Sequence, residues 1–188
     1  YTFSNCTGLT KLTLPNQVKS IGDGAFNACT SLTEMKLPNS VVNIGDGVFA
    51  NCINLESVTL PEKMTVLGGR FFEGCRKLTH VEIPKSVTEI GQYAFYNCAV
   101  KDVVIPDGVT SIDDYTFYNS GLQTITLPEG LTTIGWRAFS NCTGLTTLVM
   151  PDTVQTLGEE AFYRCSNLQT IKLSSKLTKI PRYAFEEN

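Results

Sequence analysis

"LTEMKLPNSVVNIGDGVFANC", residues 32–52, is one copy of a unit that recurs along the whole chain. Phenylalanine marks the unit, because successive copies of it lie 22 or 23 residues apart. The marker positions are Phe3, Phe26, Phe49, Phe72, Phe95, Phe117, Phe139, Phe162 and Phe185. A repeat of this length is typical of solenoids, in which one unit cannot enclose a core and is stable only when it is stacked on its neighbours.

The spacing of apolar residues divides each unit into two parts. Met35 and Leu37 are two residues apart, which predicts a strand that ends at Pro38, since proline has no N–H to donate. Further on, Phe49 and Cys52 are three residues apart, which favours a short helical turn with one buried side. Each unit is therefore expected to contain one strand and one helical turn.

Stacking these units predicts an α/β right-handed solenoid with a parallel β-sheet on one face and short helical turns on the other. Equivalent residues would form ladders with a rise of roughly 4.8 Å per unit. We expect residues 1–188 to be a single array of about eight units. Because the chain opens at Tyr1 in mid-unit and ends at Asn188, where another cysteine would fall, we also expect it to be a piece of a longer array.

The full pattern, L-x-x-V-x-L-P-x-x-V-x-x-I-G-x-x-A-F-x-x-C, resembles the BspA-like subfamily of leucine-rich-repeat proteins, and the resemblance covers the whole chain. Members of that subfamily occur in surface proteins of anaerobic bacteria and some protozoa. The resemblance implies an extracellular or cell-surface location and a role as an adhesin or interaction module that binds host or neighbouring-cell proteins.

All seven cysteines lie three residues after a marker phenylalanine, at Cys6, Cys29, Cys52, Cys75, Cys98, Cys142 and Cys165. A zinc site needs ligands that converge on a point, whereas this spacing spreads them along a line. Parallel, in-register Cα–Cβ bonds would also keep the Cβ atoms too far apart for a disulfide. Catalysis by a thiol needs a base, and His80, the one histidine, is not in this ladder. We therefore predict buried packing thiols, and Ser120 in the remaining slot favours this interpretation.

Composition and motifs exclude several classes of function. The net charge of −3 provides no basic surface for nucleic acid, and no apolar run approaches the ~18 residues of a membrane helix. The sequence contains no phosphate-binding loop, H-E-x-x-H or G-x-S-x-G motif. We expect a non-enzymatic protein without a cofactor or metal.

Two sets of residues are candidates for partner binding. The first lies at outward strand positions and is the most charged part of that face: Lys36, His80, Glu82, Lys101 and Asp102. The second flanks the marker phenylalanines where the repeat shortens to 22 residues: Tyr93, Tyr96, Tyr115, Tyr118, Trp136 and Tyr163. We expect these aromatic side chains to be largely exposed, and exposed aromatic clusters are enriched at interfaces.

The predicted function is protein–protein recognition by an extracellular adhesin or ligand-binding array. The partner would be a host, matrix or neighbouring-cell protein, or a glycan. The alternative is a structural spacer or self-assembling surface element without a dedicated ligand, since a stack of strands exposes an edge at each end. Binding at defined residues by a monomer would distinguish the first from the second.

Overall fold

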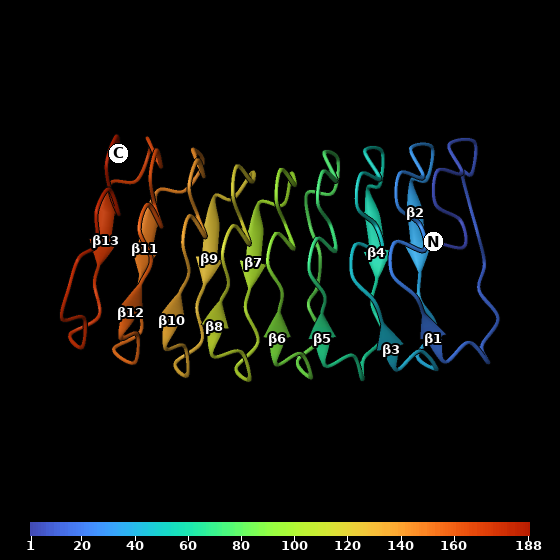
Figure 1. Ribbon diagram of the computed structural model, residues 1–188, viewed down its shortest axis with the longest axis horizontal. Coiled ribbons are helices and arrows are strands. Elements are labelled where there is room, and N and C mark those ends of the chain that lie inside the picture. Colours follow the sequence, from blue (N-terminus) through green and yellow to red (C-terminus); the bar gives the residue numbers. More distant parts are fainter.

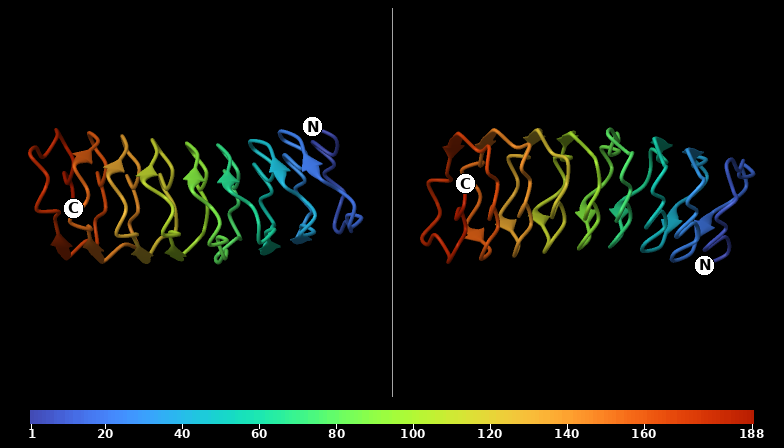
Figure 2. Two further views of the ribbon diagram at one scale, coloured as in Figure 1. Left: turned by 90° about the horizontal axis from the view of Figure 1, so that it is seen from below. Right: turned by 90° about the horizontal axis from the view of Figure 1, so that it is seen from above.

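The computed structural model describes residues 1–188, which wind into an elongated solenoid with the two termini at opposite ends (Figures 1 and 2). Thirteen short strands form two parallel ladders along it. The first strand ladder consists of β2 (Glu34–Lys36), β4 (Ser57–Thr59), β7 (Asp102–Val104), β9 (Thr124–Thr126), β11 (Thr147–Val149) and β13 (Thr170–Lys172). The second consists of β1 (Ser20–Ile21), β3 (Asn43–Ile44), β5 (Val66–Leu67), β6 (Glu89–Ile90), β8 (Ser111–Ile112), β10 (Thr133–Ile134) and β12 (Thr156–Leu157).

The first strand ladder confirms the predicted parallel pairing of equivalent residues. Met35 of β2 lies opposite Val58 of β4, one repeat further on, and β7–β9 and β11–β13 pair in the same way. The ladder consists of three separate strand pairs, and an isolated bridge between His80 and Asp102 adds one further link. In every strand of this ladder except β13, the middle residue is buried or half-buried while its two neighbours are exposed, as for Met35 in β2.

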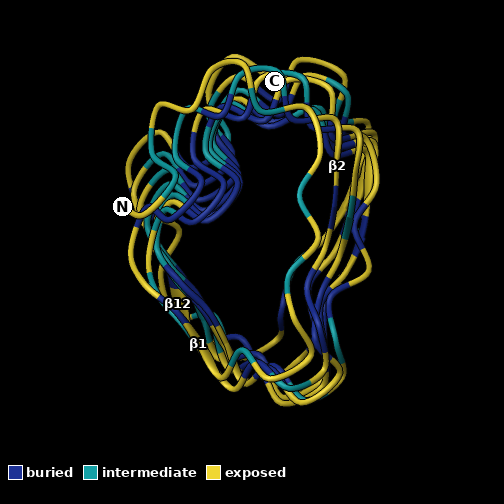
Figure 3. Cartoon of the chain, turned by 90° about the vertical axis from the view of Figure 1, so that its right-hand side faces the viewer, coloured by how far each residue is buried: buried dark blue, intermediate teal, exposed yellow.

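The second strand ladder was not predicted from the sequence. Its strands are two residues long and end directly before a glycine in most units, so they are too short for an alternating pattern to be recognised. They pair in parallel and in register, with Ile21 opposite Ile44 and Leu67 opposite Ile90. Viewed along the solenoid axis, β2 lies on one side of the closed cross-section and β1 and β12 lie on another (Figure 3).

The prediction of short helical turns was wrong, because the segment around each marker phenylalanine consists of consecutive β-turns. Within a unit, the N–H of Cys29 donates to the carbonyl of Phe26 over 3.1 Å. The N–H groups of Phe26 and Ala28 instead donate to Val48 and Ala50 of the next unit, over 3.0 and 2.8 Å. A helix would use these N–H groups internally. In this structure every second N–H group of the segment donates to the next unit instead.

These turns place two residues per unit in the left-handed region of backbone space. The positions two residues before the marker phenylalanine have φ between 51° and 61°, and they are Gly24, Gly47, Arg70, Tyr93, Tyr115, Arg137, Glu160 and Tyr183. The positions two residues after it have φ between 50° and 70°, and they are Asn5, Ala28, Asn51, Gly74, Asn97, Asn119, Asn141, Arg164 and Glu187. A positive φ at the second central residue is the signature of a type II turn, for which glycine or asparagine is the favoured residue.

The marker phenylalanines form one continuous stack through the core. Neighbouring ring centroids are 4.9 to 5.9 Å apart from Phe3 to Phe185. Phe71 packs edge-on against Phe72 and Phe49 and widens the stack at one unit. The buried residues accordingly line the inside of the cross-section and the exposed ones its outside (Figure 3).

The cysteines fill a second buried ladder beside the phenylalanine stack. All seven are free thiols and six are buried, which confirms the packing role for those six. The thiol also has a polar role: Cys52 Sγ donates to the Phe26 carbonyl over 3.1 Å, and Cys142 donates to Phe117 in the same way. Burial raises the pKa of the Cys52 and Cys142 thiols to about 12. For Cys6 the prediction of burial was wrong, because no preceding unit covers this thiol in the described chain.

The shortened units differ from the others at the residue that follows the cysteine slot. The N–H of Ala99 donates to the Cys75 carbonyl of the preceding unit over 3.1 Å, and Gly121 donates to Cys98 over 2.9 Å. In a 23-residue unit the corresponding N–H, that of Thr30, bonds within its own unit. The missing residue is thus absorbed locally, and the phenylalanine stack continues unbroken from Phe95 to Phe117 and Phe139.

A thiol reagent should separate Cys6 from the buried cysteines. A thiol whose pKa is about 12 has roughly one part in 10⁴ present as thiolate at pH 8, and thiolate is the reactive form. We expect iodoacetamide at pH 8 to modify Cys6 quickly, as measured by intact mass, and the remaining thiols only after denaturation. Rapid modification of several thiols in the native chain would contradict the buried ladder.

Removing one ring from the stack should destabilise the chain strongly. Phe117 is fully buried between Phe95 and Phe139, so Phe117→Ala should lower the free energy of unfolding by about 3–5 kcal/mol in urea titrations. Val104→Ala, on the exposed side of β7, is the matched control and should change it by less than about 0.5 kcal/mol. Similar losses for the two variants would argue against the stack as the main core.

Candidate interaction surface

The charged residues predicted on the strand face are all exposed, but the structure brings only some of them together. The backbones of His80 and Asp102 form an isolated β-bridge between neighbouring units. The Asp102 side chain accepts a hydrogen bond of 2.6 Å from Thr124 Oγ1. Lys36 and Glu82 line one shallow depression of about 560 Å³. No ion pair joins any of the five residues, so this face presents separate charges and not a single cluster.

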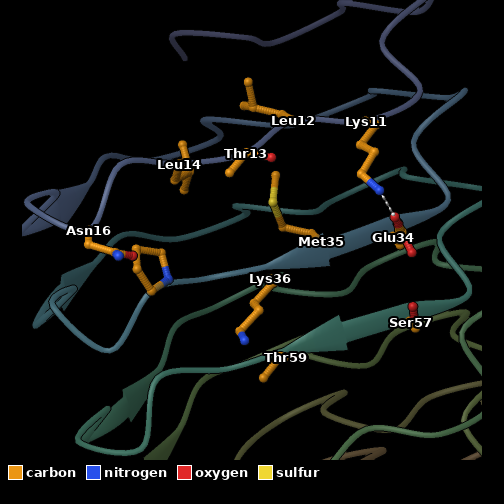
Figure 4. Close-up of a pocket in the computed structure, with 11 residues that line it drawn as sticks. Lys11, Leu12, Thr13, Leu14, Asn16, Glu34, Met35, Lys36, Ser57 and Thr59 are labelled. Atoms are coloured by element: carbon orange, nitrogen blue, oxygen red, sulfur yellow. Dashed lines mark ion pairs between the residues drawn. The ribbon is translucent and has the colours of Figure 1, made fainter.

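A second depression, of about 520 Å³, lies toward the N-terminal end of the same face (Figure 4). Lys11 and Glu34 point toward one another there and form an exposed ion pair of 2.8 Å. Lys36, Ser57 and Thr59 contribute most of the remaining polar groups. An exposed pair of this kind contributes little to stability and carries no catalytic arrangement. No set of three or more His, Cys, Asp or Glu side chains is positioned to hold a metal ion.

The predicted aromatic residues lie away from the strand face, on the consecutive turns around the marker phenylalanines. We call the surface formed by these turns the turn edge. Tyr93 stacks on Tyr115 with ring centroids 4.9 Å apart, and Tyr96 stacks on Tyr118 at 5.1 Å. Trp136 meets Tyr115 edge-to-face at 4.9 Å. These five side chains form one contiguous group, which we call the aromatic cluster.

The aromatic cluster is less exposed than the sequence predicted. Each tyrosine in it is only half-exposed, because the rings of neighbouring units cover one another's faces, whereas 42% of Trp136 is exposed. Partial burial raises the pKa of Tyr115. Tyr163 does not join the cluster, since its hydroxyl donates to Glu187 over 2.9 Å and Arg164 covers its ring.

Sequence reasoning missed two arginines that belong to this surface. The guanidinium of Arg70 lies 4.5 Å from the ring centroid of Tyr93, and that of Arg137 lies 5.1 Å from the ring of Trp136. Both arginines occupy the position two residues before a marker phenylalanine, the same position as Tyr93 and Tyr115. This shared position in the repeat is the signal in the sequence that identifies them.

The tyrosines of the turn edge occupy backbone positions that do not favour them. Tyr93 has a φ of 61° and Tyr115 one of 57°, where Gly24 and Gly47 stand in earlier units. A bulky residue in this region costs on the order of 1 kcal/mol. Each stacked aromatic pair stabilises the fold by about 0.5–1.5 kcal/mol, so stacking offsets the backbone strain and leaves little net stabilisation.

The repeat pattern was compared with known protein families. The profile of the BspA type leucine-rich repeat region, in six copies, matches residues 1–122 and 88–188. The chain belongs to the BspA-type leucine-rich-repeat family. The BspA-type match spans the strand face and the turn edge alike. A comparison with curated protein sequences gave no match.

Solved structures support the BspA-type fold. A leucine-rich repeat protein from T. pallidum is 28% identical, with a TM-score of 0.60, over 86% of this chain and 69% of that protein. A leucine-rich cell surface protein from Faecalibacterium prausnitzii A2-165 is 26% identical, with a TM-score of 0.57, over 90% of this chain and 68% of that protein. Leucine-rich-repeat proteins generally bind other proteins, and their solenoid fold is generally non-catalytic. The structure contains no helix with the length and apolar character needed to cross a lipid bilayer.

The balance between strain and stacking can be measured by substituting Tyr93. Tyr93→Gly should change the free energy of unfolding by less than about 1 kcal/mol, because relief of strain offsets the lost stacking. Tyr93→Ala loses the same ring but keeps a Cβ at positive φ, so it should be less stable than the glycine variant by about 1 kcal/mol. Urea titration checks both values. An alanine variant as stable as the glycine variant would show that the position carries no backbone strain.

Proposed function

We propose that this chain is a non-enzymatic protein-recognition module of an extracellular or cell-surface protein. The observation that supports it is the combination of a BspA-type repeat array with two long side-chain surfaces, the strand face and the turn edge. The depressions on both surfaces are open to solvent, and none of them brings a nucleophile and a base together. Surfaces of this shape suit protein partners better than small substrates.

The location is proposed from family likeness. One structural relative is described as a leucine-rich cell surface protein, and this chain is 26% identical to it. An adhesin that binds a host, matrix or neighbouring-cell protein agrees with that location. A glycan partner is less well supported, because the stacked tyrosines cover one another's faces and sugars bind to open ring faces.

The alternative is a structural spacer or self-assembling surface element. The regular backbone bonding from unit to unit favours it, since the same bonds could continue into a further copy. Such an element would form multimers whose size rises with concentration in light scattering, and it would bind no ligand. A recognition module would remain monomeric and bind a partner at defined residues.

A capture experiment tests the proposal. Purified extracellular-matrix and cell-surface proteins are passed over the immobilised chain, and binding is measured by surface plasmon resonance. Two sets of variants are compared: Lys36→Ala, His80→Ala and Glu82→Ala on the strand face, and Tyr96→Ala, Tyr118→Ala and Trp136→Ala on the turn edge. We expect saturable binding that one combined set weakens at least about tenfold, which corresponds to about 1.4 kcal/mol, while the melting curve stays nearly the same.

The two sets serve as controls for each other, because each removes exposed or half-exposed side chains from one surface only. Saturable binding that neither set weakens would overturn the assignment to these surfaces. Concentration-dependent multimers without any ligand would favour the spacer.

A further inference from the structure

A groove of about 440 Å³ adjoins the aromatic cluster on its N-terminal side. Tyr93 and Arg70 line the groove, and Asp46, Glu89 and Asp113 contribute carboxylates to the lining. The groove exists because three further lining positions, Gly68, Gly69 and Gly91, carry no side chain. A Cβ added at Gly91 would lie 2.6 Å from the backbone nitrogen of Gly69, so the close approach of these two units also requires glycine there.

The charges around the cluster do not balance. Arg70 is paired with Glu73 at 2.9 Å, and Arg137 is paired with Glu160 at 2.7 Å. The cations of this surface are thus already neutralised by carboxylates of the same chain. The acidic border consists of carboxylates that form no ion pair: Asp46, Glu89, Asp113 and Asp114. One oxygen each of Asp46, Asp113 and Asp114 accepts a hydrogen bond within the chain, and the other oxygen has no such partner.

Arginine is the side chain that packs on aromatic rings within this chain. Guanidinium groups lie over aromatic rings at Tyr93 and Trp136, and again outside the cluster at Tyr163 and Tyr183. Hydrogen bonds occupy the hydroxyls of Tyr163 and Tyr183, and Arg137 interacts with the hydroxyl of Tyr115. The hydroxyls of Tyr93, Tyr96 and Tyr118 form no hydrogen bond within the chain. The free hydroxyls at the rim of the rings and the neighbouring carboxylates that lack an ion-pair partner would receive a further guanidinium through hydrogen bonds, those to the carboxylates being charge-assisted.

We propose that the aromatic cluster and its acidic border form a docking surface for an arginine-rich segment of a partner protein. This inference rests on the proposed recognition function and specifies the chemistry of the partner. Charge complementarity selects this occupant: a second copy of the chain carries a net charge of −3, and nucleic acid would meet unpaired carboxylates.

Trp136 provides a direct probe, because it is the only tryptophan of the chain and belongs to the cluster. The full chain is titrated with a short synthetic peptide of Arg-Gly repeats, and the tryptophan fluorescence is followed. We expect a saturable change that weakens when the salt concentration rises from about 20 mM to about 300 mM, since exposed charges are then screened. The same titration with peptides of Glu-Gly and Gln-Gly repeats should give no saturable change.

Variants locate the site, with calorimetry as a readout that does not depend on the emission of Trp136, which contacts Tyr115. The double variant Tyr93→Gly with Tyr115→Gly should weaken the Arg-Gly peptide at least about tenfold, while relief of backbone strain protects the fold. Glu89→Gln with Asp113→Asn should weaken it and reduce its salt dependence. Tyr183→Gly, the same change at the equivalent backbone position outside the cluster, is the matched control and should leave the affinity unchanged.

Three results would overturn the inference: no response to the Arg-Gly peptide, an equal response to the Glu-Gly peptide, or unchanged affinity in both double variants. The capture experiment on intact partner proteins is independent of peptide chemistry. Failure of the peptide titration alone therefore removes the arginine-rich partner and leaves the recognition function standing, whereas failure of the capture experiment removes the recognition function itself.

Discussion

The hydrogen bonds that run from the turns of one unit to the turns of the next are the constraint on which the rest of the structure depends. They hold neighbouring units at the spacing of one peptide layer, as in the bonds of Phe26 and Ala28 to Val48 and Ala50. At that spacing equivalent side chains must touch, so phenylalanine meets phenylalanine and a buried thiol reaches a carbonyl of the preceding unit. The same rule operates on the surface, where it gathers tyrosines from separate units into one cluster.

The sequence predicted most of what depends on register. The spacing of Phe26 and Phe49 was enough to predict the stack, the parallel pairing and the burial of Cys29 and Cys52. The sequence did not predict the backbone path around each marker phenylalanine, because a spacing of three residues is common to a helix and to consecutive turns. Glycine in two units hinted at a positive φ, but arginine, tyrosine and glutamate conceal the same conformation in the others.

The register of the repeat also explains why the sequence predicted only part of the candidate surface. Tyr93 and Tyr115 share one slot of the repeat, and Tyr96 and Tyr118 share another, so their proximity followed from the register. Their degree of exposure did not, because it depends on rings that shield each other. The groove beside them and its unpaired carboxylates depend on side chains of several units, Asp46, Glu89 and Asp113, that no single repeat places together.

Because nearly every backbone bond outside a unit goes to the adjacent unit, the chain is mechanically a series of similar links and not a single block. A force applied along the axis would load every interface equally, so the weakest would part first while the others stay closed. Each parting would release one repeat length of slack and spare the remaining surfaces. A chain built in this way yields to strain in small steps of one repeat each.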